Sequence, residues 1–212
     1  MKRILISTLV IIATATAIIV WQRQRSSLSG DRASANSEMK DNREPAPGDL
    51  NKTPLKLPLV EPKIIVSKAA RRLTLYSKGE AVRVYRVGLG SNPTDDKTRQ
   101  GDGCTPEGSF YVCVKNPNSS YYLSLGLSYP NKEHAERGLR SRLITRAQYD
   151  RIINALEAKA RPLWDTPLGG EVFIHGHGSK SDWTLGCVAL ENDDMRELFD
   201  AVPKGATVII EP

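Results

Sequence analysis

Three closely spaced β-rich segments constrain the architecture of this chain more than any other feature. They run from Ile64 to Ser67, from Leu73 to Ser77 and from Ala81 to Gly88, and they are rich in β-branched and aromatic residues. Lys78-Gly79 separates the last two and has the composition of a tight hairpin turn. Antiparallel strands joined by short turns therefore open the domain.

More strands are expected downstream of this hairpin. Residues 91–108 are polar and glycine-rich, which is typical of a long loop, and a solvated connection is expected there rather than a wall of a site. Residues 110–114 and 121–127 have the composition of strands, and residues 206–211 would close the domain as another. The fold class predicted is mainly β with decorating helices.

Two helices are expected beside these strands. Thr145 and Gln148 have the spacing of a capping box, and the apolar residues that follow predict a helix that packs on the sheet and ends before Pro162. Asn192 is expected to cap a second helix. The apolar stripes are Tyr149, Ile152, Ile153 and Leu156 in the first helix, and Met195, Leu198, Phe199 and Val202 in the second.

The amino terminus carries an uncharged apolar segment from Ile4 to Trp21. About 20 helical residues match the ~30 Å of bilayer hydrocarbon, so residues 1–25 are predicted to be a transmembrane anchor or a signal segment. The anchor is preferred, because cleavage after Ala17 would leave apolar residues on the mature end while Trp21 suits a membrane interface. Residues 26–61 are polar and predict a flexible tether, which leaves 62–212 as the folded domain.

The composition excludes few partners on its own. The chain has 212 residues, 40% of them hydrophobic and 25% charged, which is ordinary for a globular domain. The formal charge of +6 would allow a nucleic-acid partner, but the basic residues are scattered and form no stripe with interleaved aromatics. No nucleic-acid partner is expected.

The stretch from Glu171 to Leu190 holds the residues best suited to catalysis or metal binding. Val172 to Ile174 are β-formers that lead into a glycine-punctuated loop, so His175 should lie where a strand ends. A free thiol has a pKa of about 8.5 and needs a base to become a nucleophile, and His175 is available for Cys187. Amides near Gly186 and Cys187 would face a developing oxyanion.

Residue types alone leave three interpretations of Cys187 open. The thiol can be a buried small hydrophobe in front of an apolar strand, a nucleophile activated by His175, or a zinc ligand together with His175 and His177. The zinc interpretation lacks a fourth ligand at ligand-like spacing.

The order of several motifs resembles one family. Ile174-His175-Gly176, a short polar loop and then Thr184-Leu185-Gly186-Cys187-Val188 resemble the active-site signature of the L,D-transpeptidase catalytic domain, or YkuD-like domain. Thr105 to Phe110 and the run from Lys115 to Asn131 resemble that family too, in the expected order, over roughly residues 62–212 in all. The resemblance implies a YkuD-like β-sandwich.

The resemblance also implies a mechanism. Cys187 would attack a peptide carbonyl of a peptidoglycan tetrapeptide stem, with His175 as general base, and release D-Ala. Gly176 would orient His175 through its carbonyl, and Thr184 with Gly186 would shape the oxyanion region. An amine would then resolve the thioester, and no metal or cofactor takes part. An inner-membrane anchor with the catalytic domain on the periplasmic side is the implied location.

Two departures from the family pattern leave the acceptor open. The spacer between His175 and Cys187 is shorter than usual, and Ala189 stands where many members carry arginine, although the Trp-Thr pair at Trp183 and Thr184 resembles one branch. The acceptor would be an amine on a neighbouring stem, an amine on a wall-anchored lipoprotein, or water. Water would make the protein a hydrolase, either an L,D-carboxypeptidase or an enzyme that detaches wall-linked protein. A non-catalytic wall-binding module is the remaining alternative, and the presence of both His175 and Cys187 argues against it.

Cys104 and Cys113 are the remaining cysteines, and an exported domain would allow them to pair. Two unpaired thiols are expected slightly before a disulfide.

Overall fold

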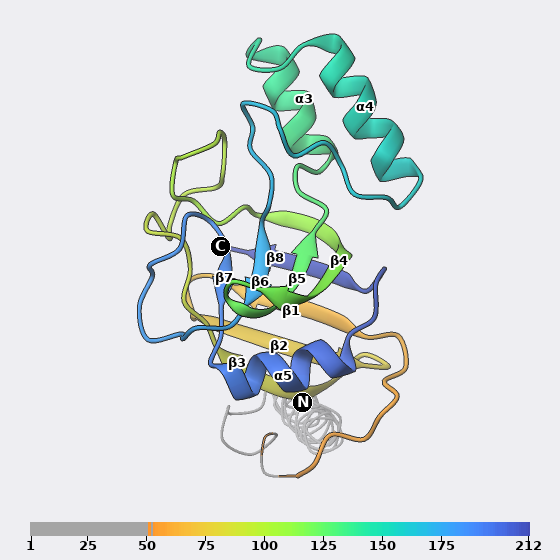
Figure 1. Ribbon diagram of the computed structural model, residues 1–212, viewed down its shortest axis with the longest axis vertical. Coiled ribbons are helices and arrows are strands. Elements are labelled where there is room, and N and C mark those ends of the chain that lie inside the picture. Colours follow the sequence, from red (N-terminus) through yellow and green to blue (C-terminus); the bar gives the residue numbers. More distant parts are fainter. Residues whose placement is uncertain (1–50, 52) are drawn as a thin grey trace, which may run out of the picture. The chain divides into compact units, whose positions relative to one another are not determined.

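The computed structural model describes residue 51 and residues 53–212. The predicted anchor over residues 1–25, and residues 26–50 and 52 of the predicted tether, lie outside the described residues. Within the described part, no helix is both long and apolar enough to cross a membrane. The strands are β1 (Lys63–Ser67), β2 (Arg72–Ser77), β3 (Glu80–Arg86), β4 (Gly108–Ser119), β5 (Tyr122–Leu127), β6 (Phe173–His175), β7 (Val188–Ala189) and β8 (Thr207–Glu211), and the helices are α3 (Lys132–Arg140), α4 (Arg146–Glu157) and α5 (Asn192–Ala201) (Figure 1).

The expected hairpin is present. β2 pairs antiparallel with both β1 and β3. Lys78 and Gly79 connect β2 to β3 with φ values of 51° and 80°, the left-handed conformation that a two-residue hairpin turn requires at both central positions. The short turn matches the right-handed twist of the strands that it joins.

The strands form a single sheet in the order β3-β2-β1-β8-β4-β5-β6-β7. β4 belongs to both halves of it, because Gly108 to Tyr111 pair with β8 while its later residues pair with β5. The two halves share one hydrophobic core, to which β1, β5, β6 and α5 all contribute fully buried side chains. Beyond β3, Gly88 exchanges two backbone hydrogen bonds with Ala189 of β7, at 2.9 and 2.8 Å. The two ends of the sheet therefore meet beside Cys187.

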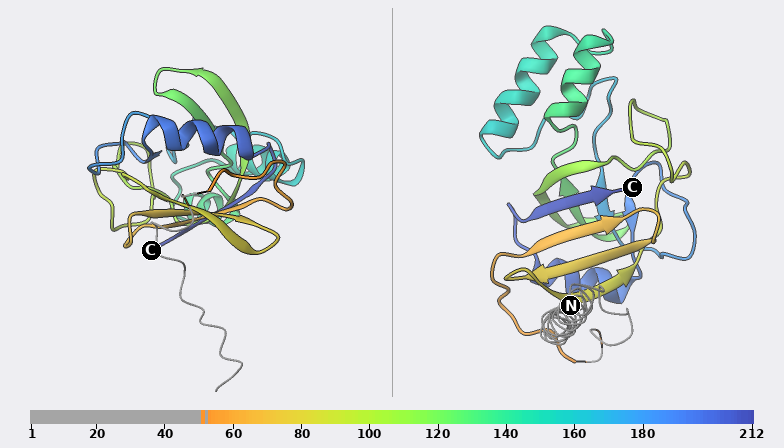
Figure 2. Two further views of the ribbon diagram at one scale, coloured as in Figure 1. Left: turned by 90° about the horizontal axis from the view of Figure 1, so that it is seen from below. Right: turned by 180° about the vertical axis from the view of Figure 1, so that it is seen from behind.

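Helix α5 covers one face of the sheet (Figure 2). Its inward residues Met195 and Leu198 are fully buried in the shared core, as their spacing predicts. The predicted cap is wrong by one residue: Glu191 is the N-cap, and Asn192 is the first helical residue. Asn192 Oδ1 instead accepts a hydrogen bond from the His177 amide at 2.9 Å, so it ties the loop after β6 to the helix.

Helices α3 and α4 lie at one end of the domain, beyond the strands (Figure 1). The predicted capping box is present: Thr145 Oγ1 accepts from the Gln148 amide and the Gln148 side chain accepts from the Thr145 amide. The prediction that α4 packs on the sheet is wrong. Its buried Ile152 packs with Ala135 and Leu168 in a separate small cluster formed mainly with α3, which the sequence analysis did not predict.

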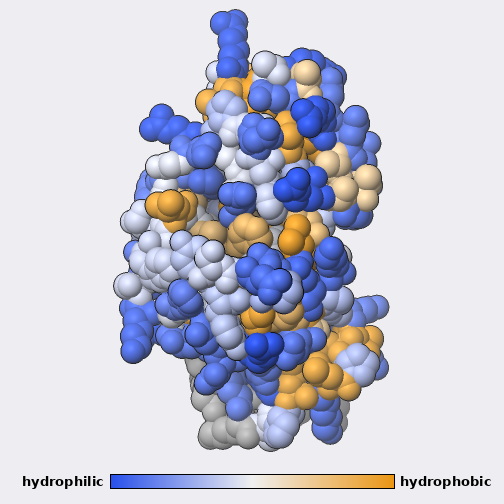
Figure 3. All heavy atoms as spheres, in the orientation of Figure 1, coloured by the Kyte–Doolittle hydropathy of each residue, from blue (hydrophilic) through white to orange (hydrophobic). Residues whose placement is uncertain are grey.

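The described residues before β1 lie against the domain. Asn51 exchanges hydrogen bonds with the backbone of Val84 in β3, and Leu55 and Leu59 pack against the core. Packing thus extends in front of residue 62, the expected start of the domain. Leu57 and Val60 are half exposed, and apolar atoms gather over this segment at the lower right of Figure 3.

Candidate active site

His175 and Cys187 come together because β6 and β7 pair in parallel. His175 is the last residue of β6 and Cys187 directly precedes β7, where Ile174 pairs with Val188. Both side chains line one cavity of about 460 Å³, whose wall includes Tyr121 and Trp183. The sequence analysis therefore placed the two residues correctly at strand ends; their catalytic roles stay predictions.

The ring of His175 is held in one orientation. Its Nδ1 lies 2.7 Å from the carbonyl oxygen of Gly176, which can only accept, so Nδ1 carries the hydrogen and Nε2 is left as the basic nitrogen. The rings of Tyr121 and Trp183 lie 4.7 and 5.6 Å from the His175 ring, centre to centre. Burial lowers the pKa of His175, although the Gly176 carbonyl opposes this. The imidazole is therefore neutral at neutral pH.

The Cys187 thiol is held by backbone groups. Its Sγ accepts from the Phe173 amide at 3.4 Å and donates to the Glu171 carbonyl at 3.6 Å. It makes no hydrogen bond to His175 in the described structure. Burial raises the pKa of Cys187, and the Phe173 amide and the Lys97 ammonium offset part of this. The resting pair is consequently a neutral thiol beside a neutral imidazole, and the thiol must turn from Glu171 to be deprotonated.

The backbone next to the thiol is fixed by a threonine. Thr184 Oγ1 accepts from the Gly186 amide at 3.1 Å and donates to the Cys187 carbonyl at 2.8 Å. The Gly186 amide, one of the two predicted oxyanion donors, is thus already engaged by Thr184, and its oxyanion role stays a prediction. The Cys187 amide donates to no oxygen in the described part of the chain, so it is the donor that remains for an oxyanion.

Gly186 is required by the space around it. Its φ is +133°, and a Cβ there would lie 2.7 Å from the Cys104 carbonyl oxygen. Real Cβ atoms do not approach backbone that closely, and other residues avoid this conformation. The glycine therefore lets the chain pass the loop that carries Cys104 immediately before Cys187.

Asp182 anchors the loop that precedes the cysteine, and sequence reasoning missed it. Its carboxylate accepts two hydrogen bonds from Arg71 Nε, at 2.9 and 3.1 Å, and one from Arg71 Nη2 at 2.8 Å. It also accepts from the amide of Leu89 at 2.9 Å. Thr184 continues the attachment, since its amide donates to the Leu89 carbonyl and its carbonyl accepts from Ser91. The loop that orients Trp183 is thus bound to the segment after β3.

The polar loop between β3 and β4 borders the cavity, contrary to the expectation of a solvated connection. Lys97, Gln100 and Gly101 all line it. The Lys97 ammonium is almost fully buried and donates to Asp102 Oδ1 at 2.8 Å and to the Arg99 carbonyl at 3.1 Å. No signal in the sequence separated this lysine from the other basic residues of the loop.

The other cysteines and His177 stand apart from this chemistry. Cys104 and Cys113 are both free, as is Cys187, which agrees with the expectation of unpaired thiols. His177 is exposed, with a φ of 77°. Among residues 51 and 53–212, no group of three or more His, Cys, Asp or Glu side chains could hold a metal ion.

A family model describes most of the chain. The model of the L,D-transpeptidase catalytic domain, YkuD, matches residues 61–210. The chain belongs to this family. The resemblance inferred from the ordered motifs is thereby confirmed, as is the mainly β fold with helices. No curated protein matches the chain in sequence.

Solved structures of similar proteins are distant in sequence. An L,D-transpeptidase from Xylanimonas cellulosilytica is 16% identical, with a TM-score of 0.44, over 74% of this chain and 64% of that one. The helical cell shape determining protein Pgp2 from Campylobacter jejuni is 23% identical, with a TM-score of 0.49, over 71% of this chain and 47% of that one. An L,D-transpeptidase from Mycobacterium smegmatis is 13% identical, with a TM-score of 0.43, over 72% and 59%. This member of the family thus spans less than two thirds of each of these three chains.

Proposed function

We propose that the chain is a cysteine-dependent L,D-transpeptidase of peptidoglycan, acylated at Cys187 by a tetrapeptide stem with loss of D-Ala. The supporting observation is the cavity that His175 and Cys187 share, in which the Gly176 carbonyl fixes the imidazole with Nε2 as the free base. Family membership supplies the substrate class, because the matched model describes L,D-transpeptidase catalytic domains.

The reaction begins with the neutral resting pair. The thiol proton moves to His175 Nε2, and the sulfur attacks the carbonyl carbon of the third stem residue. The Cys187 amide donates to the oxyanion. The bond to D-Ala then breaks, the leaving amine takes the proton from Nε2, and a thioester remains on the sulfur. An amine attacks that thioester, its proton passes through His175 to Cys187, and the free thiol is restored.

Hydrolysis on the same site is the second candidate. Ala189, where many family members carry arginine, is fully buried and paired with Gly88 in the backbone, so this position offers the substrate no cation. The cation beside the cavity is Lys97, which comes from a different loop. A site with a different arrangement of charges can resolve the thioester with a different nucleophile, including water.

The location and larger partners belong to the same proposal. The apolar segment from Ile4 to Trp21 would anchor the chain in the inner membrane, with the catalytic domain on the periplasmic side. Peptidoglycan stems are the proposed partners, and a wall-anchored lipoprotein is an alternative source of the amine.

The test is intact-mass spectrometry of the purified chain after incubation with disaccharide-tetrapeptide, alongside Cys187→Ser. The expected result is a mass increase on the wild-type protein alone, equal to the donor minus D-Ala. Cross-linked dimer among the products would identify a transpeptidase, and tripeptide alone would identify a hydrolase. A folded protein with a free Cys187 thiol that gives neither adduct nor product would refute both.

A further inference from the structure

A second cavity borders the catalytic one at Tyr121 and Trp183, and neither His175 nor Cys187 lines it. Its volume is about 450 Å³, and we call it the loop cavity because most of its wall is the loop after β6. Tyr121 and Trp183 line both cavities, so this pair of aromatic residues separates them. The other residues of the wall are His177, Gly178, Lys180, Ser181 and Glu191.

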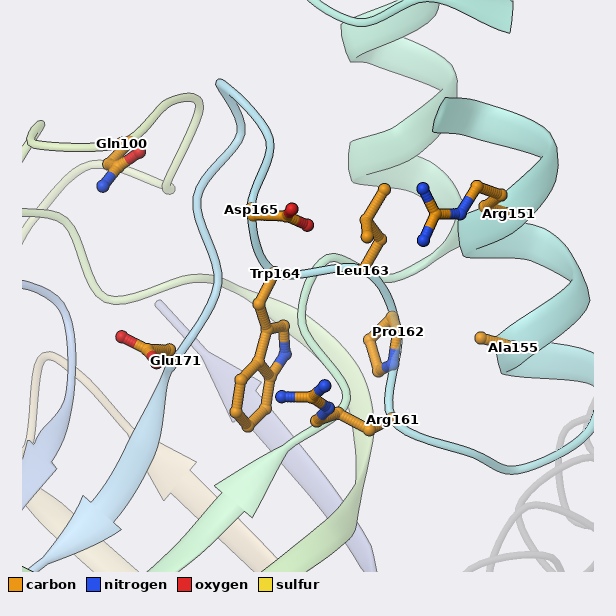
Figure 4. Close-up of a pocket in the computed structure, with 9 residues that line it drawn as sticks. All are labelled: Gln100, Arg151, Ala155, Arg161, Pro162, Leu163, Trp164, Asp165 and Glu171. Carbon is orange, nitrogen blue, oxygen red and sulfur yellow. The ribbon is translucent and has the colours of Figure 1, made fainter. Parts of the chain in front are cut away.

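The loop cavity is separate from a larger cavity beside α4. That cavity has a volume of about 820 Å³ and meets the catalytic one at Gln100, Trp164 and Glu171, whose side chains Figure 4 shows. It shares no lining residue with the loop cavity. The catalytic cavity therefore continues along two different walls, and the loop cavity is the continuation at Tyr121 and Trp183.

Exposed apolar side chains gather where the loop cavity meets the catalytic one. Tyr121, Trp183 and Leu185 are 46%, 39% and 82% exposed. Among the residues that the structure describes, the other exposed large hydrophobic side chains are Leu57 and Val60, both in the segment before β1. Apolar surface that stays in contact with water and gathers in one place is typical of a binding surface. The concentration beside the catalytic cavity therefore indicates a ligand that covers these side chains.

Both aromatic rings are held in place by the protein. The Tyr121 carbonyl accepts from the Gly176 amide at 3.0 Å, and the Tyr121 ring lies 4.7 Å from the His175 ring, centre to centre, with 31° between their planes. Trp183 Nε1 donates to the Gly178 carbonyl at 3.1 Å. The rings of Tyr121 and Trp183 lie 5.8 Å apart, at 50° to each other. They form a preorganised aromatic surface that loses little conformational entropy when a ligand binds.

The backbone of the loop cavity is fixed in an unusual conformation at His177. Its φ of 77° lies in the left-handed region, which residues other than glycine rarely adopt. The His177 amide donates to Asn192 Oδ1 at 2.9 Å, and the Gly178 amide donates to the Leu190 carbonyl at 2.8 Å. These two bonds hold the conformation from the chain that enters α5. Residues held in this way are found most often at sites that bind ligands or do chemistry.

The polar groups of the loop cavity have unused hydrogen-bonding capacity. Within the described part of the chain, the His177 ring, the Lys180 ammonium and the Ser181 hydroxyl have no hydrogen-bond partner. Glu191 Oε1 accepts from the Ser179 amide and hydroxyl, at 3.0 and 3.1 Å, while its Oε2 accepts from no group there. One ammonium and one carboxylate leave the wall without net charge. Such a wall suits a neutral ligand with many hydroxyl groups, each of which can donate and accept.

A saccharide combines the properties that the two sides of the loop cavity require. The faces of a pyranose ring carry C–H bonds, which pack on the electron-rich face of an aromatic ring, while its hydroxyl groups lie around the rim. A nucleic acid would instead bring phosphate charge, for which the cavity offers one lysine beside a carboxylate. Three extended residues span about 10 Å, so a sugar in the loop cavity can carry a peptide whose third carbonyl reaches the adjoining catalytic cavity.

We propose that the loop cavity is a glycan subsite, which binds the disaccharide that carries the donor stem. This inference rests on the proposed function, which supplies the disaccharide. A sugar ring stacks on Tyr121 and Trp183, and its hydroxyl groups form hydrogen bonds with Lys180 and Glu191. The stem crosses from the sugar into the catalytic cavity at the aromatic pair, so the bound glycan brings the scissile carbonyl towards Cys187. The chain therefore prefers stems that are still attached to sugar.

Binding is tested first, with a saccharide that carries no peptide. N,N′-diacetylchitobiose is titrated into the full-length protein and its binding is followed by ligand-observed NMR. We expect a Kd about tenfold weaker in Trp183→Leu, which loses the flat ring, and unchanged in Trp164→Leu, since Trp164 lines the catalytic cavity but not the loop cavity. Lys180→Ala, at an exposed side chain, should weaken binding about threefold, whereas the exposed Lys204 lines neither cavity and Lys204→Ala should not. Absence of binding to the wild-type protein would overturn the proposal, as would equal Kd values in each variant and its control.

The choice between two donors separates this inference from the function on which it rests. The value of kcat/KM for acylation of the full-length protein is measured with disaccharide-tetrapeptide and with the free tetrapeptide. We expect the wild-type protein to prefer the disaccharide donor about tenfold, and Trp183→Leu to lose this preference; the ratio cancels any effect of Trp183 on His175. Equal use of both donors by a wild-type protein that acylates normally refutes the glycan subsite and leaves the function intact. Failure of both donors to acylate the protein refutes the function, and the chitobiose titration then still decides whether the loop cavity binds a saccharide.

Discussion

Asp182 attaches the loop before Cys187 to the rest of the domain through two contacts, which should contribute unequally to stability. Asp182 faces Arg71 across a partly exposed ion pair, with side chains 23% and 34% exposed, and it accepts from the amide of the fully buried Leu89. Exposed ion pairs contribute about 0–1 kcal/mol, because water screens them. A buried amide left without an acceptor costs about 1–3 kcal/mol. The amide contact should therefore dominate.

Three variants separate the two contacts. Asp182→Ala removes both, and we expect the free energy of unfolding to fall by about 2–3 kcal/mol. Asp182→Asn keeps an oxygen for the Leu89 amide and loses only the charge, so the expected loss is about 1 kcal/mol or less. Arg71→Met removes the ion pair from its other side, with a loss of similar size.

Urea unfolding followed by circular dichroism measures these differences. With m of about 1–3 kcal/mol/M, Asp182→Ala should lower the midpoint by about 1 M and leave m unchanged, while the other two variants shift it by less than half as much. The alanine variant should also be acylated more slowly, because its loop no longer fixes Trp183 and Thr184. If Asp182→Asn or Arg71→Met costs as much as Asp182→Ala, the ion pair dominates and the reasoning is wrong.

Four further predictions concern the pH profile of acylation, the labelling of Cys187, the glycine before Cys187 and the pair of helices α3 and α4. Burial holds the pKa of His175 below its ordinary value of 6.5, so the imidazole stays neutral below that pH. The value of kcat/KM for acylation should therefore fall only as the pH drops through this lowered pKa. A midpoint at or above pH 6.5 would contradict the assignment of His175 as the base. Burial raises the pKa of Cys187 above 9.0, so iodoacetamide labelling of Cys187, followed by mass spectrometry, should still be accelerating as the pH rises through 9.0, and a rate that has levelled off by that pH would contradict the assignment. Gly186→Ala should abolish acylation and lower the free energy of unfolding, measured in urea, by about 2 kcal/mol or more, because it combines backbone strain with a clash. Gly79 also has a positive φ but lies in open space, so Gly79→Ala should cost about 1 kcal/mol and keep full activity. Equal losses of stability in the two variants would refute the clash. Ile152→Ala should lower the local stability of the α3–α4 pair by about 2–4 kcal/mol. Amide hydrogen exchange in α3 and α4 should then become about 30-fold faster or more, while exchange in the sheet stays unchanged. Uniform acceleration would show that the helices are part of the main cooperative unit.

Local sequence signals predicted the parts of the fold that depend on neighbouring residues. The Lys78-Gly79 turn and the Thr145 capping box are each set within a few residues, and both are present. The positions of His175 and Cys187 followed from strand endings and from the order of the family motifs. These features need no knowledge of the distant chain.

Features that depend on distant segments were missed. The apolar stripe of α4 showed that one face is buried, but not that α3 rather than the sheet covers it. Gly186 looked like a free amide donor because nothing in the sequence shows that the Thr184 hydroxyl turns back to accept from it. The role of Asp182 depends on Arg71, which is 111 positions away. Pairing over such a distance is a property of the folded chain.

The place of β8 in the sheet makes the site near Cys187 depend on a strand that contributes no residue to it. β8 lies between β1 and β4 and pairs with both. The first hairpin is therefore joined through β8 to the half of the sheet that carries His175. The same hairpin leads into Gly88, which completes the backbone around β7 beside Cys187. A chain in which β8 has not yet paired would carry Cys187 in an unfinished site, so docking of this strand is a late, long-range step in assembling the cavity.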